Sequence, residues 1–188
     1  TAWLRVMPRQ PSPDEEEAAA EGVADIVLDG ARSLPDDLVA SYAELRVLDE
    51  HGDTLKYTSE TCSILGDARS PRFSVKLSVE GGLPSNATLV VLLHGLAEGS
   101  GTPTRLGFAP LALSSRAGEW PPRQPSQFGQ AARINSGAYQ LPLLVGDLER
   151  AVAIALTAQG FVSEASLTMA AARVPCATVL VRILLPGA

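Results

Sequence analysis

Short runs of alternating apolar and polar residues recur along the chain, with turn-forming residues between them. In residues 72–79 the side chains of Phe73, Val75, Leu77 and Val79 fall on one face of a strand, opposite polar neighbours. Alternation with a period of two is typical of a strand that buries one face and exposes the other. Such strands belong to antiparallel sheets, so the pattern predicts a mostly β fold. The same alternation occurs in residues 25–29, 42–48, 54–58 and 178–185.

Two runs carry more specific expectations. In residues 54–58 the alternation sets Leu55 and Tyr57 on the apolar face, which we expect to be buried. Residues 89–93 are apolar on both faces, as in a strand at the centre of a sheet. Several short strands at this spacing predict an antiparallel β-sandwich.

The last third of the chain mixes strand and helix signals. Asp147 is a good N-cap for a helix over residues 148–159, and residues 163–173 allow a second helix. Residues 114–137 are polar and read as a long loop. We therefore divide the chain into three parts. These are a short N-terminal strand with an acidic linker (1–22), the sandwich with its long loop (23–144), and a helical appendage with a final strand (145–188).

Composition narrows the function classes. The chain is 46% hydrophobic, which is enough for a core, and its net charge is −6. Lys and Arg form no cluster, so nucleic acid is a poor partner. The sequence has no nucleotide-binding glycine motif and no metal-ligand spacing of Cys and His, so we expect no cofactor. It also has no signal peptide and begins with Thr, and we expect it to be part of a larger intracellular protein.

A family resemblance is carried by an ordered series of segments, which are residues 24–35, 41–47, 70–77, 89–93 and 106–113. In order and spacing, the series resembles the pattern of C2 domains, over residues 23–144. The resemblance implies a C2-like β-sandwich with one or two short appended helices. It also implies a docking role in intracellular assemblies such as the cytoskeleton or the cilium.

By the same resemblance, calcium ligands would come from two loops, 35–42 and 93–101. The first loop holds Asp36 and Asp37, and the second holds a single acidic residue, Glu98. Calcium takes six to eight oxygen ligands, so three carboxylates are too few for a tight site. We therefore expect a calcium-independent domain with no metal.

Other functions remain open. Arg46, Lys56, Arg72 and Lys76 are outward-facing bases that would give a phospholipid-binding face to a peripheral membrane module. An unrecognised hydrolase would have to use His94, with Cys62, Cys176 or the Ser of Gly99-Ser100-Gly101, although there is no Gly-x-Ser-x-Gly elbow. Jelly rolls and immunoglobulin-like domains also fit the strand count, but the Cys-Trp-Cys spacing of the latter is absent.

The function that the sequence favours is a non-enzymatic protein-interaction or scaffolding module. Trp120 and Phe128 are large apolar residues within the polar loop, where they are candidates to anchor a protein partner. The expected partner is therefore a protein. Membrane binding is the first alternative.

Overall fold

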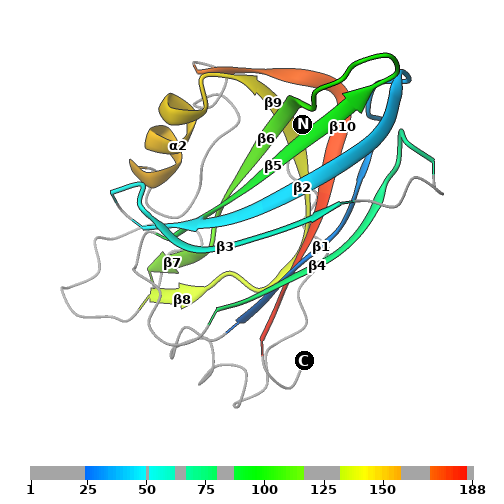
Figure 1. The fold of residues 1–188 in the computed structure, drawn as a ribbon. Coiled ribbons are helices and arrows are strands. Elements are labelled where there is room, and N and C mark those ends of the chain that lie inside the picture. The colour runs from blue at the N-terminus through cyan, green and yellow to red at the C-terminus, as the bar shows by residue number, and fades with distance from the viewer. Residues whose placement is uncertain are drawn as a thin grey trace.

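The computed structural model describes residues 24–49, 51–61, 67–79, 87–116, 132–157 and 170–185. Within these residues the chain forms ten strands and one helix (Figure 1). The strands alternate in the way that the hydrophobic pattern predicts, since β4 buries every second side chain along its whole length. The elements are β1 Ala24–Arg32, β2 Leu38–Leu48, β3 Thr54–Thr61, β4 Arg72–Val79, β5 Thr88–Ala97, β6 Thr104–Ala112, β7 Ser114–Arg116, β8 Ala132–Ile134, β9 Gly137–Gly146, α2 Leu148–Thr157 and β10 Ala171–Leu184.

Eight strands follow one another in the order β3-β2-β5-β6-β9-β10-β1-β4, and each pair is antiparallel. The link between β6 and β9 consists of a single residue pair, Phe108 with Leu144. At that seam the sheet divides into two layers of four strands, β3-β2-β5-β6 and β9-β10-β1-β4 (Figure 1). The end strands β3 and β4 contact each other on the opposite side. The predicted mostly β, antiparallel sandwich is confirmed.

The main core fills the space between the two layers. Inward side chains of both layers form one buried cluster, to which β2 contributes Ala43, Leu45 and Val47. On the outer face of the same strand lie Tyr42, Glu44 and Arg46. Burial of this apolar surface is the main force that holds the layers together.

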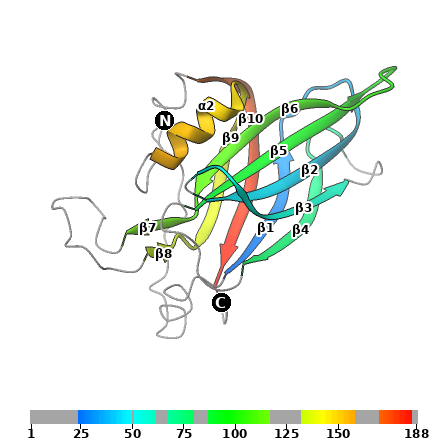
Figure 2. The same cartoon turned by 60° about the vertical axis from the view of Figure 1, so that its left-hand side comes forward.

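A second, smaller core lies on the outer face of β5 and β6, beneath α2 (Figure 2). Phe108 is its largest member and is fully buried. The helix begins as predicted, because the Arg150 backbone N–H donates a hydrogen bond to Asp147 Oδ1 at 3.0 Å. This second core explains why residues 89–93 are apolar on both faces. Its other members are Leu48, Val90, Leu92, Leu144, Ala151, Val152 and Ala171.

The final strand is longer and more central than the sequence suggests. β10 lies between β9 and β1, so this strand belongs to the sandwich itself. The expectation that residues 163–173 form a second helix is wrong at its end, because Ala171, Ala172 and Arg173 pair with β9. Pairing with a neighbouring strand outweighs the helix propensity of alanine here. Residues 163–169 lie outside the described part of the chain.

The expected long loop over residues 114–137 is structured at both ends. β7 and β8 pair with each other as a separate two-stranded ribbon, and Gly137 already begins β9. Residues 117–131 between β7 and β8 lie outside the described residues, and with them the candidate anchors Trp120 and Phe128. The N-terminal strand and linker expected over residues 1–22 also lie outside. No helix in the described residues is long and apolar enough to cross a membrane.

Candidate functional site

A polar cluster lies on the outer face of β2 and β5. Strand alternation places Tyr42, Glu44 and Arg46 on this face, and the register pairs Tyr42 with His94 of β5. The two rings stack almost in parallel, with centroids 4.3 Å apart and an interplanar angle of 5°. The stacking fixes the plane of the imidazole beside the Glu44 carboxylate.

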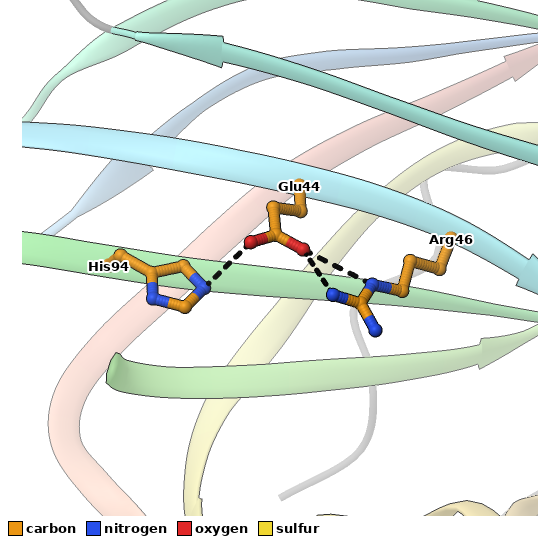
Figure 3. A network of polar contacts seen from close by, with 3 residues as sticks. All are labelled: Glu44, Arg46 and His94. Carbon is orange, nitrogen blue, oxygen red and sulfur yellow. Dashed lines mark hydrogen bonds and ion pairs between the residues drawn. The ribbon is translucent and has the colours of Figure 1, made fainter. Parts of the chain in front are cut away.

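Glu44 is a nearly buried carboxylate that contacts two basic side chains (Figure 3). Its Oε2 accepts hydrogen bonds from Arg46 Nε at 3.1 Å and from Nη2 at 2.6 Å. The Glu44 side chain is 11% exposed, whereas that of Arg46 is 42% exposed. A buried carboxylate needs such partners because it has lost its hydration. As a result the carboxylate holds the Arg46 guanidinium in one position at the surface.

His94 lies on the other side of the same carboxylate. Its Nε2 is 3.2 Å from Glu44 Oε1, but the two atoms are not aligned for a hydrogen bond. Burial lowers the pKa of His94 below its usual 6.5, and the positive charges of Arg105 and Arg46 act in the same direction, while Glu44 opposes them. The imidazole is therefore neutral at pH 7. On one side the imidazole faces the Glu44 carboxylate, and on its ring face it stacks on Tyr42.

The stability of the fold should depend on pH through His94. Because the folded pKa is lowered, the unfolded chain takes up a proton first as the pH falls below 6.5. The free energy of unfolding should therefore decrease from pH 6.5 downward, by up to about 1.4 kcal/mol per pH unit for one proton. The pKa values of Asp25 and Asp49 are lowered from 3.8, so their effect belongs to more acidic conditions. Urea unfolding followed by circular dichroism at several pH values measures the dependence.

Replacing His94 with Gln should remove this part of the pH dependence. Val39→Gln, which changes an exposed side chain of β2 that does not titrate, provides the matched control and should leave the slope unchanged. Equal slopes in wild type and His94→Gln would contradict the assignment.

An exposed apolar surface adjoins the polar cluster. The apolar side of β3, expected to be buried, is instead exposed: Leu55 is 43% and Tyr57 54% exposed. The cause is position, because β3 ends the strand order while α2 covers β5 and β6. Arg46 pairs with Tyr57 in the register, and its guanidinium lies 5.8 Å from the ring centroid, within range of a cation–π interaction. We call Arg46, Leu55 and Tyr57 the β3 face.

The structure does not bring the four candidate lipid-facing bases together. Arg46 is on β2 and is bound to Glu44, while Lys56, on β3, belongs to the opposite side of that strand from Tyr57. Arg72 and Lys76 are on the outer face of β4, in the other layer. Lys76 Nζ forms an ion pair with Asp25 at 2.7 Å.

The two loops that the C2 resemblance proposes for calcium are adjacent. The Glu98 backbone N–H donates a hydrogen bond to the Asp37 carbonyl at 2.8 Å. Asp36 Oδ1 is 2.6 Å from Arg69 Nε, so a protein cation already accompanies this carboxylate. Among the described residues no group of three or more His, Cys, Asp or Glu is placed to hold a metal ion.

Two further candidates lie apart from the polar cluster. Cys176 is exposed, with a positive φ of 60°, where β10 departs from its register with β9. Cys62 is outside the described residues. Sequence analysis identified His94 and Arg46 as candidate site residues but not Glu44. The only indication of a role for Glu44 was its position between Tyr42 and Arg46 on one face of the strand.

No family model and no curated protein matches the chain. Solved structures similar to it include the C2A domain of plant extended synaptotagmin 1, with 12% identity, a TM-score of 0.45, and coverage of 87% of this chain and 95% of that one. PLC21 of S. officinalis has 17% identity and a TM-score of 0.47, over 87% of this chain and 15% of that one. A structure of CC2D1B, which is described as coordinating ESRCT-III activity during the mitotic reformation of the nuclear envelope, has 9% identity and a TM-score of 0.49, over 97% and 62%. The resemblance to C2 domains concerns the fold alone.

Proposed function

We propose that this chain is a non-enzymatic interaction module that binds a protein partner through the β3 face. The observation that carries the proposal is the exposure of Leu55 and Tyr57 beside an arginine that is held in place. Tyr and Arg, together with Trp, are enriched among the side chains that contribute most of the affinity at protein interfaces. In this proposal the module acts as a docking unit of a larger intracellular protein and needs no calcium.

Arg46 also supports the proposed protein binding because its side chain is already ordered. An exposed arginine usually loses much conformational freedom when it binds a partner, and that loss weakens binding. Here the two hydrogen bonds to Glu44 and the Tyr57 ring already restrict the guanidinium before any partner arrives. The cost of ordering it on binding is therefore smaller, and the β3 face is prepared for contact.

Membrane binding remains the alternative, and it predicts a different result. If anionic lipid were the partner, the chain would sediment with anionic liposomes in a salt-sensitive way. Charge reversal at Lys56 and Lys76 would then weaken sedimentation. The distribution of bases over both layers favours a protein partner instead.

The proposal is tested by removing the apolar groups of the β3 face. We expect Leu55→Ser with Tyr57→Ser to lose the proteins that the immobilised wild-type chain retains from an extract of its source organism. Loss of one interface residue of this kind is worth about 2 kcal/mol, or roughly 30-fold in Kd. The dissociation constant of a retained protein, measured by calorimetry, gives the effect directly.

A matched control removes equally exposed apolar groups elsewhere. Val39 and Val145 are also exposed, on β2 and β9, outside the β3 face. Val39→Ser with Val145→Ser should retain the same proteins as wild type. The proposal is wrong if both double variants bind alike, or if binding is confined to liposomes.

A further inference from the structure

In the polar cluster, Arg46 and His94 both contact the carboxylate of Glu44. Glu44 Oε2 receives both hydrogen bonds from Arg46, and Oε1 lies 3.2 Å from His94 Nε2 without alignment. Figure 3 shows the carboxylate between the two basic side chains. Nε2 is buried and lacks a hydrogen-bond partner among the described residues. The geometry therefore leaves one contact, that between Oε1 and Nε2, incompletely formed.

Protonation of His94 would complete that contact. A protonated imidazole is a donor at both nitrogens, and a bond from a charged donor to a carboxylate is shorter and stronger than a neutral one. The imidazole cannot easily turn to reach Oε1, because its ring is stacked on Tyr42. Alignment must come mainly from rotation of the Glu44 carboxylate. Since both oxygens rotate together, Oε2 would move relative to Arg46.

The charged groups around His94 define the range of pH involved. β2 contributes Glu44 and Arg46, and β6 contributes Arg105, which pairs with His94 in the register. Burial is the main effect that opposes the added proton, and the two arginines oppose it as well, while Glu44 favours it. The response is therefore expected below pH 6.5, where histidine is commonly used as a pH sensor.

We infer that His94, Glu44 and Arg46 form a proton-sensitive clamp, in which protonation of His94 draws the Glu44 carboxylate toward Nε2 and loosens its hold on Arg46. The clamp belongs to the fold and does not depend on the proposed docking function. Its output is the position of one surface guanidinium, next to Tyr57. Such coupling needs only a rotation within a side chain and no change of the backbone.

The test is nuclear magnetic resonance of the whole chain labelled with ¹⁵N. The Arg46 Nε–Hε signal is assigned by its absence in Arg46→Lys, and the His94 ring signals by their absence in His94→Gln. During an acid titration we expect the Arg46 signal to shift with the same midpoint as the His94 ring. His51→Gln should leave this shift intact, whereas His94→Gln should abolish it.

A second variant tests the path through the carboxylate. Glu44→Gln removes the charge that links the two basic groups while keeping the side-chain shape, so His94 should still titrate but the Arg46 signal should no longer follow it. The inference is overturned by an Arg46 signal that does not move while His94 titrates, or by one that moves equally in His94→Gln. Unfolding of the wild-type chain before His94 titrates, seen by circular dichroism, would overturn it too.

Discussion

Replacing Phe108 with Ala should lower the free energy of unfolding by about 3–5 kcal/mol. The side chain is fully buried and is the largest member of the second core, beneath α2. Truncation to Ala loses the free energy that is gained when the ring is buried away from water. It also leaves a cavity that the strands cannot fill. Because Leu144 of β9 belongs to the same core, the loss of the Phe108 ring affects both the helix and the seam between β6 and β9. Urea unfolding followed by far-UV circular dichroism measures the change.

A comparison with a second buried phenylalanine shows whether Phe108→Ala weakens the packing of α2 in particular or the packing of the whole protein. Phe73 is equally aromatic and buried but belongs to the main core between the layers. Phe73→Ala should destabilise the protein by a similar amount. Only Phe108→Ala should accelerate amide hydrogen exchange in α2 ahead of exchange in β1 and β10. If α2 remains as protected as those strands in Phe108→Ala, the second core does not hold the helix.

Replacing Gly107 with Ala should destabilise the sandwich by about 3 kcal/mol. A Cβ atom at this position would lie 2.6 Å from Leu143 Cγ and 2.6 Å from the Leu144 carbonyl oxygen. The Leu143 side chain has some freedom to move, but the carbonyl belongs to the backbone of β9. The added methyl group would act as a wedge beside the Phe108–Leu144 pair. For a chain of this size the thermal midpoint should fall by about 6–12 °C.

Gly101 provides the control for this prediction. It lies in the turn before β6, where an added Cβ would meet no atom within 4 Å. Gly101→Ala should change the free energy of unfolding by less than about 0.5 kcal/mol. Equal thermal midpoints for Gly107→Ala and Gly101→Ala would show that the two layers adjust at the seam without cost.

The fold was predictable because its strands follow a simple local rule. Alternation of apolar residues such as Phe73, Val75 and Leu77 reflects a core on one side only, and β4 follows it along its whole length. The start of β10 was not predictable in this way. Ala171 and Ala172 suit a helix by intrinsic propensity, and only their pairing with β9 makes them a strand.

The site was less predictable because it depends on neighbours that are remote in sequence. Glu44 alternates with core residues and reads as a solvated charge, but the register brings His94 beside it from another strand. Leu55 and Tyr57, in contrast, were expected to be buried and are exposed. Their alternation equals that of a buried strand, and their exposure follows from the place of β3 at the end of the order.

The pairing of β1 with β10 has a consequence for how the protein is made. Asp29 and Arg182, whose side chains form a two-pronged ion pair across these strands, are 153 positions apart. During synthesis β1 emerges well before β10, which is one of its two neighbours in the sheet. The layer β9-β10-β1-β4 therefore cannot close until β10 has left the ribosome. Contacts of such long range are slow to form, so β1 and β4 should need protection from aggregation until β10 has emerged.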